Sequence, residues 1–203
     1  MKIRLHKNDL PDGVDLGSVV AIDTETLGLN PNRDRLCLVQ LASGDDGCHL
    51  VQFDAGAYDA PNLKHLLADS RVLKLFHFAR FDLAVMKKYM GVMARPIYCT
   101  RTASKLVRTY TDRHGLKDLV RELLSVDLSK EQQTSDWGAP ELTEKQLAYA
   151  ANDVAYLHRL KEALDKMLLR EGRVELAQAC FEFLPHRAEL DLAGWADTDI
   201  FAH

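Results

Sequence analysis

Three short apolar stretches within the first 53 residues limit the folds that this chain can adopt. Residues 19–22, 35–42 and 47–53 have the length and the apolar content of buried strands. The last two are separated by Gly-Asp-Asp-Gly at residues 44–47, which has the composition of a tight turn. Consecutive strands joined by short turns pair antiparallel, so the chain is expected to begin with an antiparallel sheet.

Strands and helices alternate in the next part of the chain. The expected elements are a helix at 61–69, a strand at 72–77, a helix at 79–90 closed by Gly91, and a strand at 96–99. From residue 100 only helices are expected, at 100–110, 116–124, 144–170 and 174–183 before Pro185; a capping box of Thr143 and Gln146 starts the third. Strand-helix-strand returns add parallel strands to a sheet. This order resembles the ribonuclease H-like α/β fold, a mixed sheet of three antiparallel strands and then parallel strands, flanked by helices.

A single domain spanning residues 1–203 is expected from the length of the chain. Its C-terminal tail, residues 185–203, contains large apolar side chains and has little of its own to bury them: Leu192, Trp195, Ile200 and Phe201. Contact with another subunit is one interpretation, and docking onto the tail's own domain is the other. No apolar run approaches about 18 residues and no signal peptide is recognisable, so a cytoplasmic protein without membrane contact is expected.

The formal net charge of −4 conceals a basic segment. Residues 95–121 contain seven basic and two acidic side chains, a formal charge of +5, which leaves −9 for the rest of the chain. A local basic strip on an acidic protein suits a short phosphorylated substrate, or one that enters a single groove, better than a long duplex. A solvated helix face is the alternative interpretation.

Acidic residues occur where the predicted elements can bring them together. Asp23 and Glu25 follow the strand at 19–22, and the two-residue period of a strand points both carboxylates to one side. Alone, this pair is also typical of turn residues that end a strand. Asp82 lies early in the helix at 79–90 among apolar neighbours, where a carboxylate needs a partner. Interaction with the helix dipole is the alternative for Asp82.

Tyr149 and Asp153 are four residues apart in the predicted helix at 144–170, so both side chains lie on one face. Four carboxylates from a strand and two helices are the ligands that hard cations such as Mg²⁺ or Mn²⁺ prefer. Two such ions about 4 Å apart stabilise the attacking and leaving oxygens of a phosphoryl displacement and activate water near neutral pH. The four acids therefore predict phosphodiester hydrolysis with two divalent cations.

The role of Tyr149 follows from the acidity of a phenol. With a reference pKa of about 10, a tyrosine is a poor general base at neutral pH. We therefore expect Tyr149 to orient the attacking water rather than to remove its proton. The four cysteines lie far apart, without the spacing of a zinc site or the density of a disulfide scaffold, and offer no competing metal site.

The spacing of these residues resembles the three motifs of the DEDDy 3′→5′ exonuclease family: Asp23-x-Glu25, His77 to Asp82, and Tyr149-x-x-x-Asp153. The resemblance implies that the four acids bind two metal ions, that Tyr149 acts with them, and that nucleoside 5′-monophosphates leave from the 3′ end. Ser135-Asp136-Trp137 is similar to the ribonuclease D branch of that family. Ribonuclease D carries further helical nucleic-acid-binding domains, and this chain is not expected to be long enough to contain them.

More of the chain resembles the nano-RNase C family of compact, ribonuclease D-like enzymes. The likeness covers residues 23–29, 33–37, 77–82, 109–117, 183–185 and 194–195. It implies that the substrates are 5′-phosphorylated dinucleotides, including the linear di-GMP formed when cyclic-di-GMP is opened. It also implies a homo-oligomer in the form of a closed octameric ring.

Three candidate substrate-binding residues lie beside the acids in sequence. Thr26 and Leu29 match positions that contact the 3′-terminal nucleotide in the nano-RNase C family, where the residue at Leu29 wedges between bases. Packing at the end of a strand is the alternative for both. His77 is a further candidate, although a histidine after an apolar strand is at least as often a core residue.

Basic residues supply the other candidates for substrate binding. Arg101, Lys105 and Arg108 follow helical spacing and are expected to present one basic face toward phosphate. Arg113 and His114, in the turn that follows, are candidates for holding a 5′-phosphate.

Other functions remain open at the level of sequence. The chain could trim longer RNA such as tRNA precursors, or degrade DNA from its 3′ end, since the expected metal site does not itself read the 2′-hydroxyl. A catalytically silent RNA-binding module is the alternative of a different class. The presence of all four acids and Tyr149 argues against a silent module.

Overall fold

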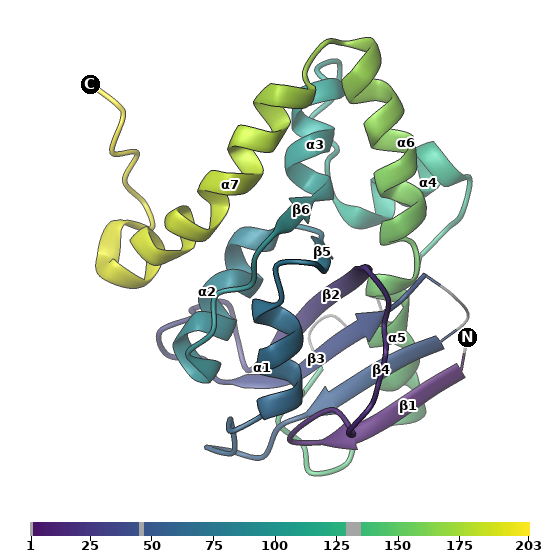
Figure 1. The fold of residues 1–203 in the computed structure, drawn as a ribbon, viewed down its shortest axis with the longest axis vertical. Helices are drawn as coiled ribbons and strands as arrows, with labels where there is room; N and C mark the ends of the chain where they lie inside the picture. Colours follow the sequence, from purple (N-terminus) through teal and green to yellow (C-terminus); the bar gives the residue numbers. More distant parts are fainter. Residues whose placement is uncertain (1, 45–46, 129–134) are drawn as a thin grey trace.

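A mixed sheet forms the centre of the computed structural model, which describes residues 2–44, 47–128 and 135–203 (Figure 1). Its six strands have the spatial order β1-β4-β3-β2-β5-β6. The strands are β1 (Lys2–Lys7), β2 (Val19–Thr26), β3 (Leu36–Ala42), β4 (Gly47–Gln52), β5 (Leu73–Phe76) and β6 (Ile97–Cys99). Strands β2, β3 and β4 pair antiparallel, and β5 and β6 extend the sheet in parallel from β2. The predicted ribonuclease H-like mixed sheet is confirmed.

Helices cover both faces and one end of this sheet (Figure 1). Helices α1 (Pro61–Ala68) and α2 (Ala79–Met90) lie in front of the strands in this view, and α5 (Glu144–Ala155) lies behind them. The group at the upper end consists of α3 (Thr100–Val107), α4 (Leu116–Leu124), α6 (Leu157–Arg170) and α7 (Val174–Leu190), which continues into η1 (Asp191–Trp195). Within the described ranges, none of these helices has the length and apolar character required to cross a bilayer.

Two strands differ from the sequence-based expectation. Strand β1 was not predicted, because it is an edge strand whose charged, exposed side chains hide the apolar pattern while its backbone pairs with β4. Strand β2 runs to Thr26, so Asp23 and Glu25 lie within the strand rather than after it. The turn predicted around Asp45 and Asp46 lies outside the described residues.

Two helices also differ, because tertiary packing overrides the local pattern. The predicted helix at 144–170 is interrupted at Tyr156, whose φ is −110° and ψ −3°. Helix α5 packs on the sheet and α6 packs on α3, and one straight helix could not follow both surfaces. Pro185, expected to follow a helix end, lies buried inside α7, where packing against α2 holds the helix together despite the missing N–H.

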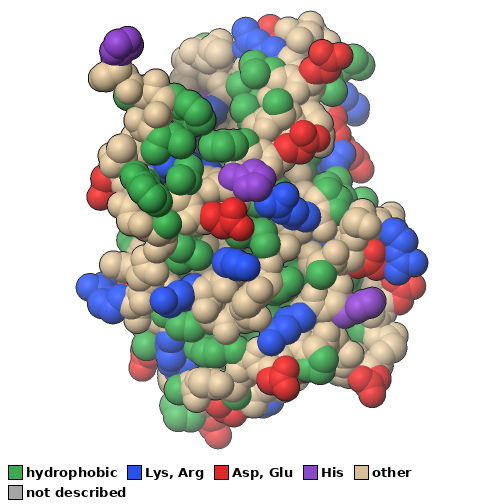
Figure 2. Space-filling view, turned by 60° about the vertical axis from the view of Figure 1, so that its left-hand side comes forward, with side chains coloured by type: hydrophobic (Ala, Val, Ile, Leu, Met, Phe, Trp, Pro, Cys, Tyr) green, Lys and Arg blue, Asp and Glu red, His purple; other side chains and the backbone are tan. Residues whose placement is uncertain are grey.

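The C-terminal tail folds back along α7. The Asp191 carboxylate accepts hydrogen bonds from Arg80 on α2, and an ion pair of 3.1 Å joins it to Arg187. Phe201 packs against Phe183 with ring centroids 5.9 Å apart. Figure 2 shows apolar side chains gathered below the end of the chain, and those of Trp195, Ile200 and Phe201 are exposed.

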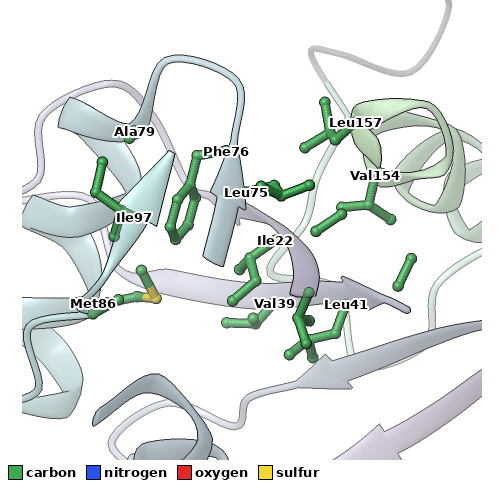
Figure 3. Close-up of a cluster of buried hydrophobic side chains, with 14 of the residues drawn as sticks. Ile22, Val39, Leu41, Leu75, Phe76, Ala79, Met86, Ile97, Val154 and Leu157 are labelled. Carbon is green, nitrogen blue, oxygen red and sulfur yellow. The ribbon is translucent and has the colours of Figure 1, made fainter. Parts of the chain in front are cut away.

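The core lies between the sheet and the helices on its two faces (Figure 3). Ile22 of β2 points toward Met86 of α2 on one face of the sheet, and Leu75 of β5 points toward Val154 of α5 on the other. Burying side chains from β2, α2 and α5 in one cluster fixes the relative positions of the three elements that carry the predicted acids.

Candidate active site

Strand β2 supplies two of the acids. Its two-residue period places the side chains of Asp23 and Glu25 on one side of the sheet and that of Thr24 on the other. The Thr24 hydroxyl donates a hydrogen bond of 2.7 Å to Oδ1 of Asp82 on α2. Thr24, which lies between the two acids of β2, thus links this strand to α2, the helix that carries the third acid, Asp82.

Asp82 lies in the first turn of α2 and is almost completely buried. The helix follows Phe78, whose φ of 71° and ψ of 46° place it in the left-handed region. This conformation is strained for a bulky residue, and strain of this kind is concentrated at functional sites. The sharp turn at Phe78 leads the chain directly from β5 into α2, so that Asp82 reaches the same cavity as the β2 acids.

Helix α5 supplies Tyr149 and the fourth acid. Its start is fixed by the predicted capping box, in which the Thr143 hydroxyl accepts from the backbone N–H of Gln146 at 3.3 Å. Ala150 and Ala151 are buried and small, which allows the helix to pack closely on β2, β3 and β4. Tyr149 and Asp153 then face the acids of β2.

One cavity of about 720 Å³ collects the predicted catalytic residues. Asp23, Glu25, Asp82, Tyr149 and Asp153 all line it. Carboxylate oxygens of Asp23, Glu25 and Asp153 lie within 4.8 Å of one another. The structure therefore brings together all five residues, with three acids in direct proximity and Asp82 beside them.

Burial raises the pKa of each acid, and repulsion by neighbouring carboxylates adds to this for Asp23, Glu25 and Asp153. Burial raises the pKa of Glu25 to about 9, and the charges of Asp153 and Asp82 add to this effect. Burial raises the pKa of Asp82 to about 7, and burial together with the charge of Asp82 raises that of Asp153 to about 7. The pKa of Asp23 is raised well above its usual value by burial and by the other three carboxylates. Such a cluster requires a positive charge to be fully ionised at neutral pH.

Divalent cations fit this donor set. The four acids offer only oxygen atoms, which suit Mg²⁺ or Mn²⁺, and no cysteine or histidine belongs to the described cluster of potential ligands. A bound cation would favour the ionised carboxylates and remove the repulsion that raises their pKa values.

Tyr149 retains its proton at neutral pH. Burial and the charges of Asp153, Glu25 and Asp23 raise the pKa of its phenol far above neutrality. Its ring packs at a tilt of 40° against Trp137, with centroids 6.1 Å apart. Tyr149 is thus a positioned hydrogen-bond donor, and not a base, in the metal-free protein.

The basic residues are distributed differently from the expectation. Of Arg101, Lys105 and Arg108, only Arg101 lines the cavity. Lys105 is exposed outside the lining, and Arg108 is completely buried, with its guanidinium paired to Glu122 and hydrogen-bonded to Ser104. The basic face that helical spacing predicted is therefore not formed, because Arg108 turns inward to join α3 to α4.

The loop after α3 contributes little to the cavity lining. Arg113 is exposed, and its backbone carbonyl accepts a hydrogen bond from Arg108 at 2.7 Å. His114 is buried, with Nδ1 2.9 Å from the hydroxyl of Ser104. Neither lines the cavity, whereas Lys117, three residues further on, does.

Thr26, Leu29 and His77, the candidates for substrate contact beside the acids, line the cavity. Leu29 is 88% exposed, so it is not engaged in the strand-end packing that was the alternative. His77 Nδ1 lies 2.9 Å from the hydroxyl of Thr100, and burial, with the charge of Arg101, lowers its pKa to about 3. His77 is therefore neutral at physiological pH.

Some lining residues were not identified from the sequence, notably Phe78, Lys117 and Trp137. Phe78 directly follows His77, but its left-handed backbone leaves no signal in the sequence. Lys117 belongs to the basic segment at 95–121 and was not separated from the other cations there. Trp137 was noted only as part of a family motif.

Comparison with known proteins agrees with this geometry. A family model described as a 3′-5′ exonuclease matches residues 8–169. Ribonuclease D of Gluconacetobacter diazotrophicus is 38% identical over 156 residues, which cover 77% of this chain and 39% of that protein. The chain thus spans well under half the length of this curated relative.

Solved structures include matches over the full length of the chain. Brucella melitensis NrnC with bound Mg²⁺ is 57% identical, with a TM-score of 0.96 and complete coverage of both chains. Brucella melitensis NrnC bound to pGG is 58% identical, with a TM-score of 0.97 and coverage of 100% of this chain and 99% of the other.

Proposed function

The chain belongs to the 3′-5′ exonuclease family and is a ribonuclease D-like, NrnC-like exoribonuclease, and from this premise we propose that its substrates are short oligoribonucleotides. The preferred substrates are 5′-phosphorylated dinucleotides, such as linear di-GMP, which are hydrolysed to nucleoside 5′-monophosphates. The observation that carries this proposal is the full-length likeness to an NrnC whose structure contains pGG. The cavity supports it, since the acids share it with Arg101 and Lys117.

The residues of the cavity have different roles in hydrolysis. Asp23, Glu25, Asp82 and Asp153 would hold two divalent cations, Mg²⁺ or Mn²⁺. These cations, once bound, stabilise negative charge on the attacking and leaving oxygens of an in-line displacement. Tyr149 donates a hydrogen bond that orients the attacking water. The water oxygen bonds to phosphorus as the P–O3′ bond breaks, which releases a nucleoside 5′-monophosphate and a new 3′-hydroxyl.

The rest of the cavity orients a short substrate. Arg101 and Lys117 also line the cavity, although they are distant from the acids in sequence. Their positive charges suit the phosphate at the 5′ end of a dinucleotide. Thr26 and the exposed Leu29 contact the 3′-terminal nucleotide, with Leu29 between the two bases.

A kinetic comparison of substrates tests the proposal. The purified protein, with Mg²⁺ or Mn²⁺, is given 5′-labelled RNAs from two nucleotides upward and DNA of the same sequences. We expect the diribonucleotide to be consumed fastest and the Asp153→Ala variant to be inactive on all substrates. A preference for long RNA would instead indicate ribonuclease D-like trimming, and a preference for DNA would indicate a DNA exonuclease. An inactive parent protein would contradict the proposed function.

A homo-oligomer, in the form of an octameric ring, is proposed for the assembly by resemblance to the nano-RNase C family. The exposed apolar residues of the tail, Trp195, Ile200 and Phe201, support a subunit contact there. Sedimentation of the parent protein should give the mass of an octamer, and Phe201→Asp should give a smaller particle. A monomeric parent would contradict this assembly.

A further inference from the structure

The segment Ser135-Asp136-Trp137 and the loop that follows it have no part in the mechanism above, yet they are held firmly beside the cavity. Four side chains donate hydrogen bonds to backbone carbonyls of this segment, with lengths of 2.9–3.3 Å: Gln146 to Asp136, Arg35 to Gly138, Gln52 to Ala139 and Lys7 to Pro140. The Asp136 carboxylate also accepts from the backbone N–H of Gly138 at 3.0 Å. Fixing the loop in this way fixes the direction of the Trp137 side chain.

Gly138 allows the loop to approach the cavity. A Cβ atom at this position would lie 2.7 Å from Cδ2 of Leu27 and 3.2 Å from Nη2 of Arg35. A larger residue here would require the Leu27 and Arg35 side chains to move aside, so glycine lets the loop pack against the segment that follows β2 without such a shift. The close approach brings Trp137 into the cavity lining beside Tyr149.

Trp137 is 3% exposed, and its indole nitrogen Nε1 is fully buried without a hydrogen-bond partner among the described residues. A buried indole N–H normally finds an acceptor, because leaving it unpaired costs stability. Trp137 lines the cavity, so a shift of its ring when the cavity is occupied would bring Nε1 to an acceptor of the occupant.

We propose that Trp137 is a substrate-binding residue, which donates its indole N–H to an oxygen of the nucleotide held against Tyr149. This inference rests on the proposed nuclease function. The indole is a donor only, so its partner must be an acceptor, either the oxygen of a ribose hydroxyl or an oxygen of the phosphate. The packing of Trp137 on Tyr149 places its ring beside the residue to which we assign orientation of the attacking water.

Kinetics of Trp137→Phe test the hydrogen bond, because phenylalanine keeps a ring against Tyr149 and removes only the donor. We expect kcat/KM on a 5′-phosphorylated diribonucleotide to fall about tenfold. A loss confined to the diribonucleotide, and absent from its 2′-deoxy analogue, identifies a 2′-hydroxyl as the acceptor. An equal loss on both places the acceptor among the oxygens that the two substrates share, those of the phosphate and the 3′-hydroxyl. Unchanged kinetics on both substrates, or a loss matched by an equal fall in Mg²⁺ affinity, would overturn the assignment.

Fluorescence provides a second test that needs no turnover. The chain has two tryptophans, so in Trp195→Phe the emission comes from Trp137 alone. Guanosine 5′-monophosphate with Mg²⁺ should change this emission saturably, whereas the matched Trp137→Phe protein, which retains only Trp195, should not respond. An unresponsive Trp137 would overturn the proposal. Since binding is read directly, this result is independent of whether the parent protein prefers dinucleotides.

Discussion

The acids and Tyr149 have different roles in the cavity because they differ in protonation. The acids need cations to become fully charged, because burial and mutual repulsion raise their pKa values. Tyr149 keeps its proton for the same reasons, since burial and the nearby carboxylates oppose formation of phenolate. One electrostatic environment therefore produces both a cation site and a neutral hydrogen-bond donor.

Removal of the Tyr149 hydroxyl tests whether Tyr149 acts as a hydrogen-bond donor while the acids bind the cations. Tyr149→Phe should lower kcat on the order of 10²-fold, because the attacking water loses its orienting donor. Mg²⁺ affinity, measured by calorimetry, should remain close to that of the parent protein. Tyr156→Phe is the matched control, since Tyr156 ends the same helix and does not line the cavity. Loss of Mg²⁺ affinity in parallel with kcat would contradict the assigned role.

The raised pKa values also predict how the metal-free protein responds to pH. Asp82 and Asp153 have pKa values of about 7 when folded, against about 4 when unfolded. Between these values the unfolded chain releases protons that the folded protein keeps, so the free energy of unfolding decreases as pH rises. The melting temperature in EDTA should therefore fall from pH 5 to pH 8.

Saturating Mg²⁺ should reverse most of this loss, because it favours the charged carboxylates. The Asp153→Asn protein should show a smaller dependence on pH than the parent. A metal-free melting temperature that rises over this range would show that the acids are not buried together.

At the scale of elements, the start of α5 determines where Tyr149 and Asp153 lie. The capping box at Thr143 and Gln146 satisfies two backbone donors, and the Gln146 amide also holds the loop at Asp136. Thr143→Ala should lower the free energy of unfolding by about 1 kcal/mol, as measured by urea denaturation. Thr143→Ser, which keeps the capping oxygen, should remain close to the parent. Equal effects of the two substitutions would exclude the cap as the cause.

The tail is joined to α2, the helix of Asp82, through Asp191. Its carboxylate is nearly buried and accepts from Arg80 at 2.5 and 2.7 Å. Asp191→Asn should destabilise the protein by about 1–3 kcal/mol and expose residues 191–203 to limited proteolysis. Asp199→Asn is the control, because Asp199 contacts only the tail itself in the described hydrogen bonds. Equal protease sensitivity of the two variants would contradict an anchoring role for Asp191.

At the scale of the whole molecule, the position of a charge matters more than the net charge of −4. Lys117→Glu and Lys105→Glu change the net charge equally, but only Lys117 lines the cavity. Lys117→Glu should raise KM for a 5′-phosphorylated dinucleotide by about tenfold or more, and Lys105→Glu should have little effect. Equal changes in KM would show that the long-range field, and not the cavity, attracts the substrate.

The sequence by itself determined the mixed sheet, most element boundaries and the five residues, proposed as catalytic, that share one cavity. Local patterns suffice for these, since apolar periodicity reports burial and fixed spacings report a shared face. Only the tertiary structure decided that β1 completes the sheet, that the helix after Thr143 breaks at Tyr156, and that Arg108 is a buried link.

Local sequence patterns also do not show that Lys117 and Trp137 line the cavity while Lys105 does not. Which way a side chain finally points depends on packing between elements far apart in sequence. The free energies of such packing contacts exceed the local conformational preferences of the chain. These contacts therefore cannot be inferred from the residues adjacent in sequence.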